Sequence, residues 1–438
     1  MKQLLFILAL AFTASTFAQL SYRVEQPNGW VFSETAKPTI PVVIKNSGDK
    51  VESRTLSLTV TNDIRESYSS WDSSVRTVAC PVIDKWVTVQ PNDSLTVTFR
   101  FNLENPDFYL CVLSAFENAP SGMPSEPRNV DFFKRFTIGY EPTKIISPPD
   151  AQPDFKTFWD KAKQELAGVK PEYQLTQIKT DTNKYRKLYL VKMKSLGGVE
   201  IQGYYSTPSK KGKYPAEIHY MGYDSRPWIP SGYSDRIEFV LSTRNQGLLK
   251  DTATDNLWLT WGLDDKDHYY YRGACMDLVR AIDFVASRSE VDVERIVAEG
   301  GSQGGAFTLA AAALDNRLRA IAPSVPFLSD YPDYFKIVDW PGNWLLVKQR
   351  ELGISDEDFY KTLSYFDIKN LASQITCPVL MCVGLQDDVC PPHTNFAGYN
   401  LIPSEKYYII YPNQAHSAGI EWWQEKEKFL KKYLFKQN

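Results

Sequence analysis

The stretch Glu299-Gly300-Gly301-Ser302-Gln303-Gly304-Gly305 contains a Gly-x-Ser-x-Gly pattern, which predicts a nucleophilic serine at position 302. Residues 295–298 before it form a short apolar run typical of a buried strand, and residues 306–314 after it are rich in strong helix formers. Such a strand-to-helix turn needs small neighbours, because a Cβ beside the serine would clash with the strained backbone. The helix start also offers backbone N–H groups to a developing oxyanion. The alternative is a glycine-rich turn with an incidental serine.

Strand and helix patterns alternate around this turn, from Asp154 to the C-terminus. Residues 155–166 and 274–286 have the spacing of helices. The predicted strands are residues 188–193, 200–206, 216–220, 296–298 and 379–383. The last two are continuous apolar runs, as expected for strands covered on both faces. The pattern predicts an α/β domain over residues 154–438, with a largely parallel sheet and flanking helices.

A serine hydroxyl needs a histidine base, and the chain has only four histidines: His219, His268, His393 and His416. In hydrolases with this turn the chain order is serine, acid, histidine, which leaves His393 and His416. His416 follows the predicted strand 407–411, where a catalytic loop belongs, so we predict that it is the base. His393 lies in Pro391-Pro392-His393, a predicted turn and helix start, and is predicted to be structural.

The acid should leave the end of the preceding strand, residues 378–384, where Asp387 and Asp388 both follow. Spacing alone does not choose between the two. One oxyanion donor is predicted to be the backbone N–H of Gln303, directly after the nucleophile. The second should come from the loop after an earlier strand, and Tyr223 is the candidate.

The N-terminal part has a different pattern. Residues 19–140 contain short β-rich segments separated by turn residues and no convincing helix, which predicts an immunoglobulin-like β-sandwich. Residues 141–153 carry several prolines and are predicted to be a stiff linker. Before these parts, residues 1–18 combine Lys2, a short apolar run and a small-residue cleavage site, which predicts a secretory signal peptide.

The expected location is therefore outside the cell or in the periplasm. The residue directly after the predicted cleavage site is Gln19 rather than cysteine, so a lipid anchor is not expected. No other segment approaches membrane-spanning length. A net charge of −3 gives no indication of nucleic-acid binding.

Six cysteines show no Cys-x-x-Cys spacing, so the sequence predicts no metal site and no cofactor. Four scattered histidines also argue against a metal-dependent deacetylase. Cys80 and Cys111 are the only cysteines in the N-terminal third, and the sequence leaves open whether they form a disulfide.

Over residues 153–435 the chain resembles the acetyl xylan esterases and cephalosporin-C deacetylases of carbohydrate esterase family seven. The motifs that carry this resemblance are residues 154–159, 222–223, 244–247, 269–272, 300–305, 325–328, 363–367, 383–387, 390–392 and His416. The resemblance implies an α/β-hydrolase fold with Ser302 as nucleophile, Asp387 as acid and His416 as base. It also implies Tyr223 and Gln303 as oxyanion donors and Phe327 near the acyl pocket.

Three departures from the family pattern stand out. The family usually has glycine at Asn245 and glutamate at Ser417, and residues 248–268 form a shorter segment than usual. In relatives that segment contributes subunit contacts and the mouth of the pocket, so a homo-oligomer and the substrate preference both stay open.

We therefore expect a secreted serine esterase that removes acetyl groups from acetylated xylan or xylooligosaccharides. The alternatives are another α/β-hydrolase, such as a peptidase or glucuronoyl esterase, and a non-catalytic glycan-binding protein. The sequence does not identify the acetylated sugar.

Overall fold

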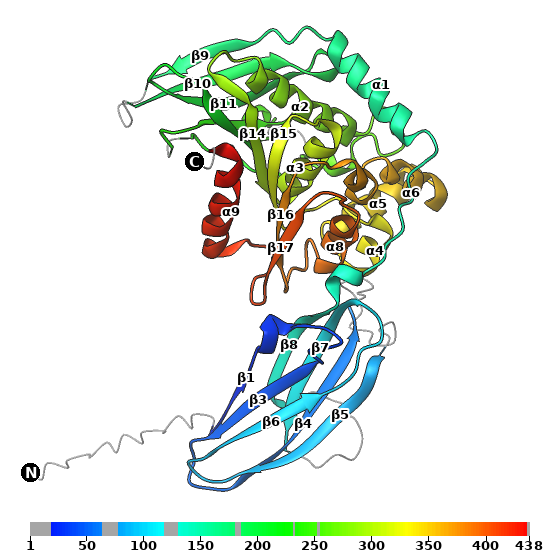
Figure 1. Cartoon of the computed structure of the whole chain (residues 1–438). Helices are drawn as coiled ribbons and strands as arrows, with labels where there is room; N and C mark the ends of the chain where they lie inside the picture. Colours follow the sequence, from blue (N-terminus) through cyan, green and yellow to red (C-terminus); the bar gives the residue numbers. More distant parts are fainter. Residues whose placement is uncertain are drawn as a thin grey trace, which may run out of the picture.

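The computed structural model describes residues 19–63, 78–117, 130–179, 185–230, 233–251 and 255–435. An N-terminal part built of strands precedes a larger part in which helices surround a sheet (Figure 1). The predicted signal peptide lies outside the described residues and stays a prediction. Within those residues, no helix has both the length and the apolar character needed to cross a membrane.

The N-terminal strands form two sheets. The three-stranded sheet has the order β1 (Leu20–Val24), β3 (Thr39–Asn46), β6 (Ser94–Arg100). The five-stranded sheet has the order β2 (Val31–Phe32), β8 (Val130–Tyr140), β7 (Asp107–Phe116), β4 (Glu52–Asn62), β5 (Val78–Val89). All pairings are antiparallel except the short contact between β2 and β8.

Alternation along these strands explains why both sheets bury one face. Ile40, Val42 and Ile44 of β3 are fully buried, as are Leu56 and Leu58 of β4, while the residues between Ile40, Val42 and Ile44 are partly exposed. Both sets belong to one hydrophobic core. The arrangement favours the predicted β-sandwich, and the immunoglobulin-like topology stays a prediction.

The two N-terminal cysteines are free thiols. Cys80 of β5 and Cys111 of β7 both lie opposite Val60 of β4, on its two sides. Strands two positions apart are separated by about 9.5 Å, which exceeds the Cα separation that a disulfide spans. The disulfide left open by the sequence is therefore not formed.

The C-terminal part is built on a nine-stranded sheet. Its order is β17 (Lys406–Tyr411), β16 (Val379–Gly384), β15 (Leu318–Ser324), β14 (Val291–Gly301), β12 (Tyr214–Tyr220), β13 (Ile237–Ser242), β11 (Glu200–Pro208), β10 (Arg186–Lys194), β9 (Gln174–Ile178). The pairings from β17 to β13 are parallel, whereas β13, β11, β10 and β9 pair antiparallel. The sheet is therefore mixed, with the predicted parallel arrangement confined to one half.

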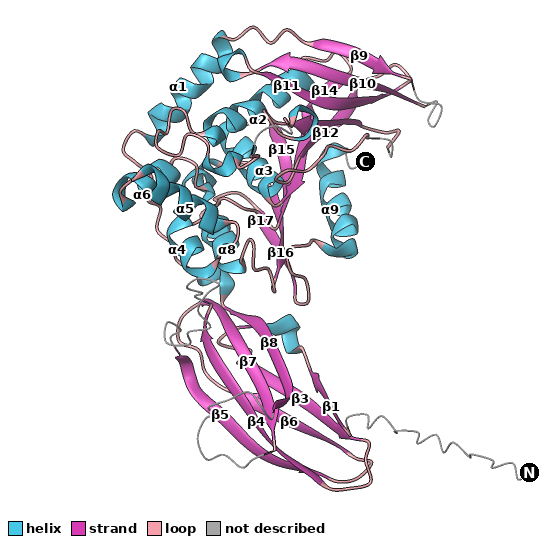
Figure 2. Ribbon diagram, turned by 180° about the vertical axis from the view of Figure 1, so that it is seen from behind, coloured by secondary structure: helices cyan, strands magenta, loops and turns pink. Residues whose placement is uncertain are grey.

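Helices cover both faces of the parallel half (Figure 2). The helices are α1 (Phe155–Gly168), α2 (Tyr270–Ala286), α3 (Gln303–Leu314), α4 (Tyr331–Ile337), α5 (Gly342–Leu352), α6 (Asp356–Ser364), α7 (Ile368–Leu371), α8 (Pro392–Asn400) and α9 (Gly419–Leu434). In β14, Ile296 and Ala298 belong to the main core that contains α2 and α3, while Val297 packs in the smaller core with α9. This two-sided burial explains the continuous apolar run.

The proline-bearing stretch that joins the two parts is packed rather than free. The side-chain amide of Asn400, at the end of α8, donates to the carbonyls of Pro142 (3.0 Å) and Ile145 (2.9 Å). Asn370 of α7 makes two hydrogen bonds with Asp150. Its Oδ1 accepts from the backbone N–H of Asp150 (3.0 Å), and its Nδ2 donates to the Asp150 carboxylate (2.8 Å). The predicted linker therefore follows the surface of the C-terminal part.

Candidate active site

Ser302 occupies a strained turn between β14 and α3. Its backbone angles are φ 59° and ψ −122°, a conformation that side chains other than glycine rarely adopt. The flanking glycines have no room for a side chain. A Cβ on Gly300 would lie 2.6 Å from the carbonyl oxygen of Tyr220, and one on Gly304 would lie 2.1 Å from it. The Gly-x-Ser-x-Gly pattern is thus a packing requirement of a turn that projects the hydroxyl.

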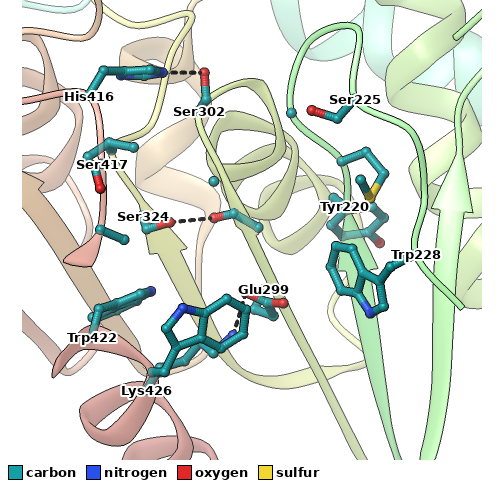
Figure 3. A pocket seen from close by; sticks show the side chains of 17 residues that line it. Tyr220, Ser225, Trp228, Glu299, Ser302, Ser324, His416, Ser417, Trp422 and Lys426 are labelled. Atoms are coloured by element: carbon teal, nitrogen blue, oxygen red, sulfur yellow. Dashed lines mark hydrogen bonds and ion pairs between the residues drawn. The ribbon is translucent and has the colours of Figure 1, made fainter. Parts of the chain in front are cut away.

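Three side chains that are far apart in the sequence form a hydrogen-bonded row. Ser302 Oγ lies 2.9 Å from His416 Nε2, and His416 Nδ1 lies 2.9 Å from Asp387 Oδ2 (Figure 3 shows the first contact). Each residue follows the carboxyl end of a parallel strand: β14, β16 and β17. Because these ends meet at one edge of the sheet, the topology brings the three together.

The structure places Asp387, of the two neighbouring aspartates, against the histidine. Asp387 is 2% exposed, and its second oxygen accepts hydrogen bonds from the backbone N–H groups of Val389 (2.9 Å) and Cys390 (2.8 Å). These bonds orient the carboxylate toward His416. Asp388 is exposed to solvent.

The loop after β12 lies against the start of α3, as the two predicted oxyanion donors require. A Cβ on Gly304 would come within 3.0 Å of the Met221 carbonyl carbon, so the backbones on either side are in direct contact. Gln303 is the first residue of α3, where a backbone N–H has no partner within the helix. Tyr223 is anchored through its hydroxyl, which donates to the carbonyl of Asn256 (3.0 Å).

A buried amide, Gln246, joins these two loops. Its Oε1 accepts from the backbone N–H of Asp224 (3.0 Å), and it exchanges two 3.2 Å amide hydrogen bonds with Gln303. Its Nε2 also donates to the hydroxyl of Tyr270 (2.8 Å). Gln246 belongs to the family motif at residues 244–247, but the sequence alone predicts no role for it. The preceding Asn245 has φ 64°, which explains why glycine is usual there and why asparagine is tolerated.

Replacing Gln246 with leucine should lower kcat by about 10- to 100-fold, because misplacing a catalytic group by about 1 Å can cost as much. Leucine has a similar size but cannot hold Asp224 and Gln303 together. Gln349→Leu is the control, since Gln349 is also buried and hydrogen-bonded but lies in α5. Steady-state kinetics and thermal unfolding separate the effects. Equal kcat values for both variants would show that Gln246 only stabilises the fold.

Phe327 lies beside the turn that carries Ser302. Its backbone N–H donates to the carbonyl of Ser302 (3.1 Å), and its side chain is buried against Tyr334, with ring centroids 5.5 Å apart. A role for Phe327 in the acyl pocket stays a prediction.

An open cavity of about 380 Å³ adjoins the serine and histidine. Tryptophans form much of its far wall: Trp228, Trp422 and Trp423 (Figure 3 labels the first two). Trp423 is 56% exposed and Trp228 41%. Ser417, where relatives have glutamate, lines the same cavity.

The wall below Ser302 is an ionic network. Glu299 of β14 lies 2.8 Å from Lys426 Nζ of α9 and 2.6 Å from His219 Nδ1. Burial alone would lower the pKa of His219, but the carboxylates of Glu238 and Glu299 outweigh it and raise the pKa to about 10. Carboxylates thus hold the His219 ring beneath the cavity, away from the serine.

Comparison with known proteins identifies a family. Residues 141–434 match the family model described as acetyl xylan esterase (AXE1). Acetyl esterase Axe7A of Xylanibacter ruminicola is 31% identical over 314 residues, covering 68% of this chain and 71% of that protein. The acetyl xylan esterase structure from a Paenibacillus species has 32% identity and a TM-score of 0.62, covering 67% of this chain and 99% of its own. Acetyl xylan esterase 1 from a Thermoanaerobacterium species has 30% identity and a TM-score of 0.61, with coverages of 66% and 96%.

Proposed function

This chain belongs to the acetyl xylan esterase family and is a serine carboxylic-ester hydrolase, and we propose that it deacetylates xylan or xylooligosaccharides through an acetyl-serine intermediate. The observation that carries the mechanism is the row Ser302–His416–Asp387, with both contacts at 2.9 Å. This is the arrangement that turns a weak hydroxyl nucleophile into a strong one.

In the proposed reaction, His416 Nε2 takes the proton of Ser302 as Oγ attacks the acetyl carbonyl carbon. Asp387 accepts the Nδ1–H of His416, which holds the base in the correct tautomer and stabilises the imidazolium. The oxyanion forms between the backbone N–H groups of Tyr223 and Gln303, where losing one such donor costs roughly 3–4 kcal/mol in related systems. His416 then protonates the sugar hydroxyl that leaves, and later activates the water that releases acetate.

The cavity wall favours a carbohydrate as the part of the substrate that leaves. Trp423 and Trp228 both present exposed indole surface to the cavity that adjoins the serine. Flat aromatic faces suit sugar rings, while the ionic and hydroxyl groups of the same wall suit sugar hydroxyls.

Replacing Trp423 with alanine should raise KM for acetylated xylooligosaccharides about 5- to 10-fold, the loss of one aromatic stacking contact. The kinetics with p-nitrophenyl acetate, which lacks a sugar, should stay nearly unchanged. Trp86→Ala is the matched control, because Trp86 is 48% exposed but lies on β5 of the N-terminal part. An equal loss with both substrates would argue against a sugar subsite at Trp423.

Substrate class is best tested by measuring acetate release from acetylated xylooligosaccharides beside hydrolysis of a longer-chain ester, a glucuronoyl ester and a peptide. We expect the acetylated sugar to have the highest kcat/KM. A higher value for any of the other three substrates would replace the proposed function with that activity.

We also propose export of the enzyme, from the apolar run and cleavage site within residues 1–18. The expected mature N-terminus is Gln19, which N-terminal sequencing of protein from the medium or periplasm would test. Protein retained in the cytoplasm with residue 1 intact would contradict it.

A further inference from the structure

A second group of ionisable side chains lies where the N-terminal strands meet the esterase domain. Figure 2 shows α4 and α8 next to the end of β7. Asp107, the first residue of β7, contacts His393 of α8 with 2.6 Å between Oδ1 and Nδ1. Asp330 and Asp333, at the start of α4, face the other nitrogen of the same ring. None of the four lines the cavity at Ser302.

The two carboxylate contacts of His393 Nε2 are longer than the usual hydrogen bond of 2.7–3.2 Å. Nε2 lies 3.4 Å from Asp330 Oδ2 and 3.4 Å from Asp333 Oδ2. Asp330 is only 1% exposed, yet among the described residues its Oδ2 and His393 Nε2 have no hydrogen-bond partner. The other oxygen of each carboxylate is occupied: Lys369 Nζ lies 2.9 Å from Asp330 Oδ1, and Lys336 Nζ lies 2.7 Å from Asp333 Oδ1. Two carboxylate oxygens and one imidazole nitrogen thus face one another.

This is the donor set of a metal ion. In metal sites the other N–H of a ligating histidine is usually held by a carboxylate, the position that Asp107 takes at Nδ1. A tetrahedral site with metal–ligand bonds of 2.0–2.2 Å has ligands roughly 3.3–3.5 Å apart, which matches the two 3.4 Å separations. We propose that Asp330, Asp333 and His393 bind a divalent cation, Zn²⁺ by preference for the mixed nitrogen and oxygen ligands.

Room for a further ligand adjoins the group. A cavity of about 170 Å³ is lined by Asp333, His393, Asp107 and Asn62. Asn62 Oδ1, at the end of β4, is buried without a hydrogen-bond partner. Water or this amide oxygen would complete the coordination, and the contact between Asp107 and His393 ties β7 of the N-terminal part to the cation held by α4 and α8.

A proton on Nε2 is the alternative occupant. Burial by itself would lower the pKa of His393. The carboxylates of Asp107, Asp330 and Asp333 outweigh burial and raise this pKa well above its usual range. However, a charge-assisted N–H···O⁻ bond is about 2.7–2.9 Å long and would draw one carboxylate closer. Equal spacing to two carboxylates fits a cation between them. Since a lysine already pairs with each carboxylate, we expect a chelator to remove the cation readily.

The test uses the full-length enzyme, stripped with a chelator and titrated with ZnCl₂ by calorimetry, with Mn²⁺ and Ca²⁺ compared. We expect the wild type to bind one Zn²⁺ per chain and Asp333→Asn to lose this binding. We also expect Zn²⁺ to raise the Tm of the wild type but not of Asp333→Asn. Asp333 is 35% exposed, so the variant should fold. His268→Gln is the control for adventitious binding, because the His268–Asp265 pair is exposed and its loss should change nothing.

Two results would overturn the proposal. One is Zn²⁺ binding of equal affinity and stoichiometry in Asp333→Asn and the wild type, which would place the ion elsewhere. The other is that the stripped wild type binds no Zn²⁺. In that case a protonated His393, held by the three carboxylates, would occupy the site instead. Neither result depends on esterase activity, so the proposed function is judged separately.

Discussion

Replacing Ser302 with alanine is expected to lower kcat for acetate release by about 10⁶-fold, the loss seen when a triad serine is removed. Alanine keeps the Cβ and therefore the same backbone strain at φ 59°. It removes only Oγ, which lies 2.9 Å from His416 Nε2. The variant should therefore unfold at nearly the wild-type Tm while losing its nucleophile.

Ser417→Ala is the matched control for this experiment. Ser417 lines the same cavity and follows His416, but it has no place in the proposed proton transfer. Its loss should change kcat by less than about tenfold. Near-normal acetate release by Ser302→Ala would reject Ser302 as the nucleophile.

The second large effect is expected at Asp387. Changing it to asparagine should lower kcat by about 10⁴-fold, because the amide favours the wrong tautomer of His416. The side chain keeps its size, and one oxygen can still accept from the backbone N–H groups of Val389 and Cys390. The fold should survive, which circular dichroism and Tm would verify.

Asp388→Asn provides the comparison, since Asp388 is adjacent but exposed. Its kcat should remain within about twofold of wild type, as expected for a change at a solvent-exposed side chain. If Asp388→Asn were the more damaging of the two, the acid would be assigned wrongly.

The strand-to-helix turn at Ser302 could be predicted from the local sequence, because the steric constraints on its backbone come from neighbouring residues. The glycines at 300 and 304 are required by a backbone carbonyl, and chain order then singled out His416. Choosing Asp387 over Asp388 needed either the family resemblance or the structure, because adjacent turn residues have the same spacing. The antiparallel half of the sheet was missed, since strand direction depends on connections that strand patterns do not encode.

Long-range pairs outside the expected order of serine, acid and histidine could not be predicted from the sequence. Gln246 lies 57 residues from Gln303, and Asp107 lies 286 residues from His393. No motif or spacing connects such pairs, so their roles appear only when the fold brings them together. His393 was predicted to be structural, and that prediction is compatible with a place at the junction between the two parts.

The N-terminal strands lie outside the family match, which begins at residue 141, directly after β8 ends at Tyr140. They nevertheless reach the catalytic loops. Gln386, next to Asp387, exchanges hydrogen bonds of 2.8 and 3.1 Å with the backbone of Thr137 in β8. The N-terminal part therefore packs against the loop that carries the proposed acid.

The most direct test of the central claim is to trap the acyl-enzyme. Wild-type enzyme would be mixed with an acetylated xylooligosaccharide, quenched in acid within the first turnover, digested and analysed by mass spectrometry. We predict one added acetyl group on the peptide that contains Ser302, and none in Ser302→Ala or in unreacted enzyme. An acetyl group on a different residue, or acetate released in a burst with Ser302 never modified, would contradict the account.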